Sequence, residues 1–182
     1  MERYRSDLMT VGGEVVCTTE RLTFQPRALE RAIWKSLELD LPIAKITKVS
    51  WTARRVVIDC SEESYRFAGP NSAALYAALV ALEDARAVHG STDSILFSHF
   101  PASRHHGPIA SPGLFFMTAR RLGFLLTGAL DKLTGMSDRT EVLFDNITGI
   151  YPRRDRLELQ RGDESWQFSL SPSEERYTEL LG

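Results

Sequence analysis

The sequence contains an internal repeat, and this feature constrains the fold more than any other. The segment 13–24 can be placed over the segment 113–124. Five residues recur 100 positions later, and they are Gly13, Thr18, Arg21, Leu22 and Phe24. Over residues 46–79, nine of 34 positions are identical 101 residues later, whereas ordinary residue usage gives about two. We therefore expect two copies of one unit, with a first domain over residues 1–90 and a second over 91–182.

Each copy contains several short runs that are typical of β-strands. Val15 to Thr18 and Arg21 to Phe24 are rich in β-forming residues and are separated by two residues that suit a tight turn. Residues 36–41 alternate apolar and polar side chains, which favours a half-buried strand that Pro42 ends. Residues 46–51 are a further candidate.

The last strands of each copy predict a hairpin. Residues 56–60 and 64–67 place alternate apolar side chains on one face and are joined by a polar turn. The equivalent hairpin of the second copy, residues 157–168, turns at Gly162-Asp163. Residues 1–10 and 94–100 are expected to supply the first strand of each copy.

A helix follows the strands in both copies. Asn71 or Ser72 can cap a helix over residues 73–86, which are rich in strong helix formers. In the second copy, Ser171 and Pro172 predict a helix start within residues 171–182. Strands followed by one helix, twice over, predict a mainly β (α+β) chain in which each curled antiparallel sheet is covered by its own helix.

The repeated segment resembles a known family. Gly113 to Phe124 is similar to the hallmark of GRAM domains, which is a glycine, an apolar strand, a threonine, an Arg-Leu pair and an aromatic residue. Gly13 to Phe24 is a weaker copy, and Phe67 and Phe168 match the aromatic residue before the final helix. The resemblance implies the PH superfold, so we expect two PH-like, partly open barrels of seven strands, each capped by a C-terminal helix.

The charge distribution excludes some classes of partner. The formal net charge is -2. Residues 1–90 carry 12 basic and 12 acidic side chains, and the rest of the chain carries 10 and 12. Neither half has the basic excess of a protein that binds nucleic acid through its phosphates. We therefore expect no nucleic-acid partner, and no purely electrostatic attraction to a membrane.

Cysteine usage and hydropathy predict the compartment. Cys17 and Cys60 lie among apolar residues and are expected to be reduced core thiols. No stretch reaches the roughly 20 apolar residues of a membrane span, and the N-terminus lacks the apolar run of a signal peptide. We expect a cytoplasmic protein, or one that also associates peripherally with a membrane surface.

The sequence carries no pattern that predicts catalysis. His99, His105 and His106 fit neither a zinc pattern nor a nucleophile elbow, and they lie in a segment, residues 98–113, that is interpreted as a loop or linker. There is no Gly-rich phosphate loop and no cysteine pair at metal spacing. We therefore expect a protein that is not an enzyme and uses no cofactor or metal.

Basic and aromatic residues in loops are the candidate ligand-binding residues. They are Arg27, Arg31, Trp34, Lys35, Arg54, Arg55, Arg153 and Arg154. Several such cations must converge to hold a phosphate. The alternative is that they are solvated surface residues balanced by nearby carboxylates. Trp34 either anchors a protein or membrane contact or packs against the barrel.

Two functions remain open at this point. The first is a non-catalytic protein-interaction adaptor, and the second is a module that binds phosphoinositides or other anionic lipids and recruits an assembly to a membrane. Self-association is a third route, through an apolar patch near Phe97, Phe100 or Phe115-Phe116. Arg21 and Arg121 are expected to have a structural role, such as pairing with a carboxylate like Glu20.

Overall fold

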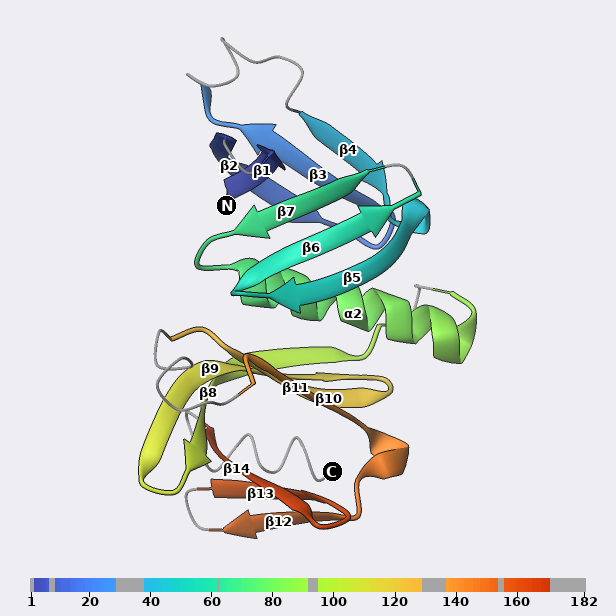
Figure 1. The fold of residues 1–182 in the computed structure, drawn as a ribbon. Helices are drawn as coiled ribbons and strands as arrows, with labels where there is room; N and C mark the ends of the chain where they lie inside the picture. Colours follow the sequence, from blue (N-terminus) through green and yellow to red (C-terminus); the bar gives the residue numbers. More distant parts are fainter. Residues whose placement is uncertain are drawn as a thin grey trace. The chain divides into compact units, whose positions relative to one another are not determined.

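The fold comes from a computed structural model that describes residues 2–6, 9–28, 38–61, 63–91, 95–128, 137–153 and 156–170, with the side chains of residues 2–10 excepted. The chain divides into two compact units, residues 1–95 and 96–182. Both units are built mainly from β-strands (Figure 1).

The described part of the first unit contains seven strands in one antiparallel series. They are β1 (Glu2–Ser6), β2 (Met9–Cys17), β3 (Arg21–Pro26), β4 (Leu39–Pro42), β5 (Ile46–Thr52), β6 (Arg55–Cys60) and β7 (Ser64–Ala68), with a short 3-10 turn, η2 (Ile43–Lys45), between β4 and β5. Their order is β4-β3-β2-β1-β7-β6-β5. The series ends at β4 on one side and at β5 on the other, so the described strands do not close into a barrel.

The helix that follows is α2 (Ser72–His89), which is longer at its C-terminal end than the predicted helix. The Ser72 hydroxyl donates to the carbonyl of Gly69 at 2.8 Å, whereas the side chain of Asn71 caps nothing. Gly90 ends the helix in the left-handed conformation that favours glycine, and its N–H donates to the carbonyl of Arg86. The helix packs against β2, β5 and β6.

Two pairs of aromatic side chains pack in the core of the first unit. Phe24 and Phe67 are fully buried, with ring centroids 6.1 Å apart. Trp51 lies 6.0 Å from Tyr76 of α2, and these tilted arrangements are typical of packed aromatic pairs. The contact of Trp51 with Tyr76 therefore ties β5 to the helix.

The second unit repeats the architecture of the first. Its strands are β8 (Phe97–His106), β9 (Ile109–Thr118), β10 (Arg121–Leu126), β11 (Arg139–Leu143), β12 (Gly149–Arg153), β13 (Arg156–Arg161) and β14 (Glu164–Leu170), with η3 (Phe144–Asn146) after β11. The order is β11-β10-β9-β8-β14-β13-β12, which is the order of the first unit strand for strand. The helix expected over residues 171–182 lies outside the described residues.

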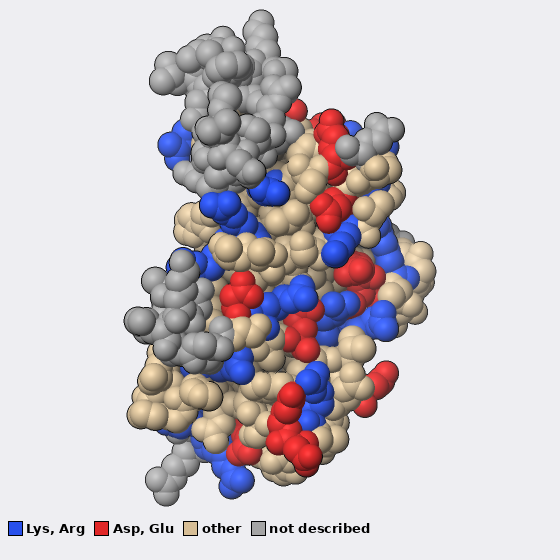
Figure 2. Space-filling model, in the orientation of Figure 1, with Lys and Arg blue, Asp and Glu red and all other residues tan. Residues whose placement is uncertain are grey.

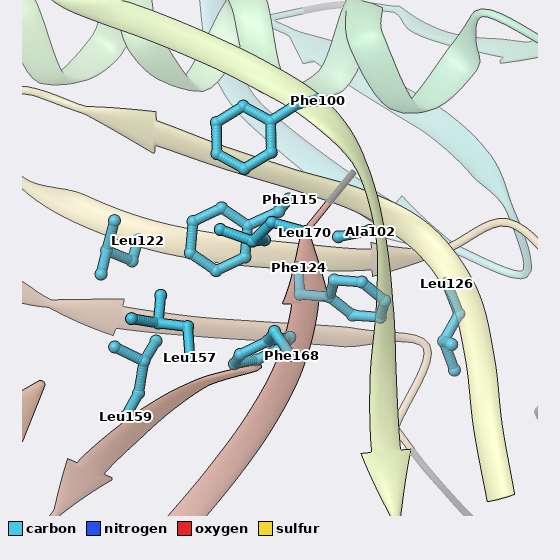
Figure 3. Packing of buried hydrophobic residues seen from close by; sticks show 10 residues of the cluster. All are labelled: Phe100, Ala102, Phe115, Leu122, Phe124, Leu126, Leu157, Leu159, Phe168 and Leu170. Carbon is cyan, nitrogen blue, oxygen red and sulfur yellow. The ribbon is translucent and has the colours of Figure 1, made fainter. Parts of the chain in front are cut away.

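The core of the second unit is a cluster of phenylalanine and leucine side chains from its strands (Figure 3). The ring of Phe168 lies 5.3 Å from the rings of both Phe115 and Phe124, and Phe100 stacks on Phe115 at 5.5 Å. Phe124 and Phe168 occupy the positions that Phe24 and Phe67 hold in the first unit. The repeated aromatic residues therefore build the same part of each core.

The interpretation of residues 98–113 as a loop is wrong, because this segment forms most of the β8–β9 hairpin. Its Ser, Pro and His content resembles a loop, yet Phe100 and Ala102 alternate into the core. Gly107 supplies the positive φ of the turn, 59°. The segment forms strands despite its composition, because apolar side chains at every second position are enough to bury one face of a strand.

The structure also corrects the expected apolar patch. Phe100, Phe115 and Phe116 are buried, and Phe97 is half-buried. Phe100 and Phe115 belong to the core cluster of the second unit and do not form an exposed surface for self-association.

Candidate functional site

A cavity of about 340 Å³ lies in the first unit between β5 and α2, and we call it the β5–α2 groove. Its volume lies at the lower end of the roughly 300–1,000 Å³ found for ligand pockets. The groove is lined by Ile43, Ile46, Thr47, Lys48, Val49, Leu79, Leu82, Glu83, Arg86 and Ala87.

Local contacts at the start of β5 shape one wall of the groove. The pairing of β5 with β6 shifts between Ile46 and Lys48, as in a β-bulge that bends the strand. The Thr47 hydroxyl donates to the carbonyl of Asp59 at 2.9 Å. On the opposite wall, Arg86 of α2 donates from Nη1 to the carbonyl of Ile43 at 3.3 Å. The first contact ties the start of β5 to β6, and the second ties η2 to the helix.

The floor of the groove is apolar and its rim is charged. Ile43, Leu79 and Leu82 are buried, and Ile46 and Val49 are half-buried beside them. Lys48 and Glu83 are exposed at the rim. A concave apolar floor with a few polar groups around it suits a large aliphatic or aromatic side chain of a ligand.

The basic residues of the first unit that were predicted to bind a ligand lie at separate places in the structure. The N–H of Arg27 donates to the carbonyl of Gly12 at 3.0 Å, so Arg27 lies beside Gly12. Arg54 and Arg55 are adjacent at the β5–β6 turn, where Arg54 is half-buried and Arg55 exposed. Arg31, Trp34 and Lys35 lie outside the described residues.

Strand register separates Arg27 from the Arg54-Arg55 turn. Arg55 pairs with Ala68, Ala68 with Glu2, and Glu2 with Gly12. Three strand spacings, about 14 Å along the sheet, therefore lie between Arg55 and the backbone against which Arg27 lies. In Figure 1, β3 ends at the upper left of the first unit, whereas the β5–β6 turn lies at its lower left. The structure does not bring these cations into one cluster.

The basic residues of the second unit are not grouped either. Arg153 is exposed, and its Nε lies 3.7 Å from Glu158 Oε2. Arg154 lies outside the described residues. Basic and acidic side chains are interspersed over the face of the molecule in Figure 2 and do not separate into one basic and one acidic region. On the face that Figure 2 shows, carboxylates therefore lie among the exposed cations.

His99, His105 and His106 lie on strand β8. The ring of His99 stacks on Phe97 at 5.1 Å, and His105 Nε2 contacts the Ser169 hydroxyl of β14. Within the described part of the chain, no three His, Cys, Asp or Glu side chains gather as metal ligands would. Neither His105 nor Ser169 lines the β5–α2 groove.

Both cysteines are free and half-buried. Burial raises the pKa of the Cys17 thiol to about 11. The pKa of Cys60 is also raised, chiefly by desolvation and then by the negative charges of Asp59 and Glu63. A raised pKa keeps a thiol protonated and unreactive near neutral pH, which is what the expectation of reduced structural thiols requires.

Sequence reasoning missed the residues of the groove. They are apolar residues of a strand and a helix, a pattern that predicts core packing rather than a site. A signal does exist, because β5 has no proline whereas its repeat partner β12 contains Pro152. The proline distinguishes the two strands from each other. This difference can be interpreted only when the structure has shown that both strands lie at an edge of their sheet.

The described helices include none that is long and apolar enough to cross a bilayer. No family model matches the sequence, and no curated protein matches it. Among solved structures, the chain is similar to one described as the crystal structure of the C-terminal domain of an unknown protein from Leishmania infantum, at 16% identity and a TM-score of 0.41. That match covers 54% of this chain and 89% of the other.

Proposed function

We propose that this chain is a non-catalytic tandem of PH-like/GRAM-like modules that acts as a protein-interaction adaptor. Its first unit receives an apolar side chain of a partner protein in the β5–α2 groove. The groove is the observation that carries the proposal, because it combines a buried aliphatic floor with a charged rim in a cavity large enough for such a side chain.

Two features support the PH-like/GRAM-like part of the proposal. The described residues of each unit form seven antiparallel strands, in an order that is open between the fourth and fifth strands. In the first unit a helix directly follows the seventh strand. These are the strand number, the opening and the helix position that the family resemblance implies.

The chemistry of the groove favours a protein over a phosphoinositide. A phosphate needs several converging cations that replace its water, but the described basic residues lie apart, and the groove itself is lined mainly by aliphatic side chains. Arg86 and Lys48 are the cations at the rim, with the carboxylate of Glu83 beside them. Apolar anchors in pockets with polar rims are how proteins bind one another.

The test is a selection of phage-displayed random 12-residue peptides on the full chain. Peptides that bind are measured again on Ala87→Trp, which places an indole at the groove from an exposed position of α2. Val88→Trp is the matched control, because Val88 is exposed on the same helix but does not line the groove. We expect Ala87→Trp to weaken binding at least about tenfold and Val88→Trp to leave it unchanged.

Three outcomes contradict the proposal. They are a selection that yields no binding peptide, peptides whose affinity is the same on both tryptophan variants, and binding to vesicles instead. For the last, the chain is sedimented with phosphatidylcholine vesicles that contain or lack phosphatidylinositol bisphosphate. Salt-sensitive sedimentation that is lost on Arg54→Glu with Arg55→Glu would establish the anionic-lipid alternative.

A further inference from the structure

The charges at the rim of the β5–α2 groove indicate which part of a partner protein enters it. Resting on the proposed function, we propose that the groove binds the C-terminus of a partner chain. The aliphatic side chain of the partner's last residue packs on the floor of the groove, and its terminal carboxylate is held by Lys48 and Arg86.

Arg86 brings its guanidinium to the edge of the apolar floor. Its Nη1 donates to the carbonyl of Ile43 at 3.3 Å, and Ile43 is a buried residue of that floor. Within the described residues this is the one polar contact of the guanidinium. It uses one of five N–H donors, so the others are available to a carboxylate, which arginine binds in a bidentate manner.

Lys48 supplies a second cation from the opposite wall. It lines the groove from β5, and its side chain is exposed. Neither Lys48 nor Arg86 forms an ion pair within the part of the chain that the structure describes. Glu83 is the one carboxylate among the lining residues, so the rim has one positive charge in excess. Such a rim attracts a single carboxylate, whereas a phosphate needs more converging cations.

The position of the cations favours a terminal carboxylate over an acidic side chain. Because the Arg86 guanidinium contacts Ile43 of the floor, the bound carboxylate lies close to the side chain that fills the floor. In an extended segment, the next residue directs its side chain to the opposite face, which is away from this rim. A terminal carboxylate belongs to the same residue as the aliphatic anchor. The cavity of about 340 Å³ is small for a ligand pocket and suits one such residue.

The second unit lacks the lysine of this rim. When residues 46–79 are placed over 147–180, Gly149 stands where the first unit has Lys48. A Cβ at Gly149 would lie 2.5 Å from the ring of Tyr151, so that ring occupies the space where a longer side chain would begin. The inference therefore applies to the first unit alone.

The test begins with a peptide selection in which the displayed peptides have free C-termini. We expect the selected peptides to end in an aliphatic residue. One of them is then synthesised as the free acid and as the C-terminal carboxamide, and both are titrated onto the full chain. The carboxamide has the same side chains but no terminal charge, so we expect it to bind at least about tenfold more weakly.

A variant of the groove tests which cation holds the carboxylate. Lys48→Gln removes a charge from an exposed position of β5. We expect it to weaken the free acid about two- to fivefold and to reduce the difference between acid and carboxamide, because the terminal charge has lost one partner. Lys45→Gln is the matched control, since Lys45 is also exposed but does not line the groove. It should leave both affinities unchanged.

The failures of the two proposals are distinguishable. Peptides that bind equally as acid and carboxamide, yet are weakened by Ala87→Trp, place an internal residue in the groove. This result overturns C-terminal binding and leaves the proposed function standing. An acid–carboxamide difference that is the same in Lys48→Gln as in the parent chain also overturns it, because the carboxylate then lies elsewhere.

Two further outcomes overturn both proposals. Octanoate carries a carboxylate on an aliphatic chain without a peptide backbone. If it displaces the peptide with equal affinity, the groove binds free aliphatic acids and not a partner protein. If no peptide binds, whether its C-terminus is free or tethered, both proposals fall together.

Discussion

Arg21 forms an ion pair with Asp40 across neighbouring strands, and the second unit repeats it between Arg121 and Glu141. Arg21 Nε donates to Asp40 Oδ1 at 2.6 Å, and Arg121 Nη1 donates to Glu141 Oε2 at 3.1 Å. The expectation that the repeated arginine has a structural role such as pairing with a carboxylate agrees with these contacts. The suggested partner, Glu20, is wrong, because the carboxylate comes from the next strand, β4 or β11.

The two ion pairs should differ in their contribution to stability. The side chains of Arg121 and Glu141 are 19% and 15% exposed, whereas those of Arg21 and Asp40 are 50% and 59% exposed. Water screens the exposed pair far more. We expect Glu141→Gln to lower the free energy of unfolding by about 1–3 kcal/mol and Asp40→Asn to lower it less, as measured by urea unfolding. Equal losses would contradict this ranking.

The pKa of Asp40 should depend on Arg21. The hydrogen bond from Arg21, together with its charge, holds the pKa of the Asp40 carboxyl below its ordinary value, which is about 3.9 in an unfolded chain. A lowered pKa stabilises the fold above that unfolded value, and the stabilisation is lost as the pH falls through the folded pKa. We expect Arg21→Gln to raise the pKa of Asp40, measured by carboxyl carbon NMR between about pH 2 and 6. If the pKa of Asp40 is the same in Arg21→Gln as in the parent chain, the ion pair with Arg21 does not stabilise the charged carboxylate.

The repeated glycine should tolerate no side chain. A Cβ at Gly13 would lie 2.5 Å from the ring of Phe24, and one at Gly113 would overlap the ring of Phe124. We expect Gly13→Ala to destabilise the chain by about 1–3 kcal/mol. Gly12→Ala is the matched control, since the atoms nearest to its Cβ would be those of the flexible Arg27 side chain, at 3.4 Å. Urea unfolding of the two variants measures the difference in stability. Similar losses for Gly13→Ala and Gly12→Ala would mean that a backbone effect of the substitution, and not contact with the Phe24 ring, causes the destabilisation.

The β5–β6 turn should gain stability from residues that suit it. Ala53 and Arg54 both have positive φ, 50° and 62°, a conformation that costs non-glycine residues about 1 kcal/mol or more each. We expect Ala53→Asn with Arg54→Gly to stabilise the chain by about 1 kcal/mol, because Asn-Gly is the preferred pair in such turns. Thermal unfolding measures the gain. A loss would indicate that contacts of the Arg54 side chain outweigh the backbone strain.

Much of the strand arrangement could be predicted from residue patterns that act locally. The alternation of Val56, Ile58 and Cys60 predicted a strand with one buried face, and Val56 and Ile58 are fully buried while Cys60 is half-buried. The Ala- and Leu-rich run after Asn71 predicted the helix. The β8–β9 hairpin was missed, because its Ser, Pro and His residues resemble a loop and only Phe100 and Ala102 show its buried face.

The sequence alone determined that the chain repeats one unit and is mainly β, because repetition and alternation are properties of neighbouring or equally spaced residues. Only the tertiary structure decided which strands are edges, which carboxylate meets Arg21, and that Val49 and Leu82 share a groove. These facts depend on strand order and on contacts between residues far apart in the chain. Aliphatic side chains look the same in a sequence whether they fill a core or line a cavity, and only their packing distinguishes the two.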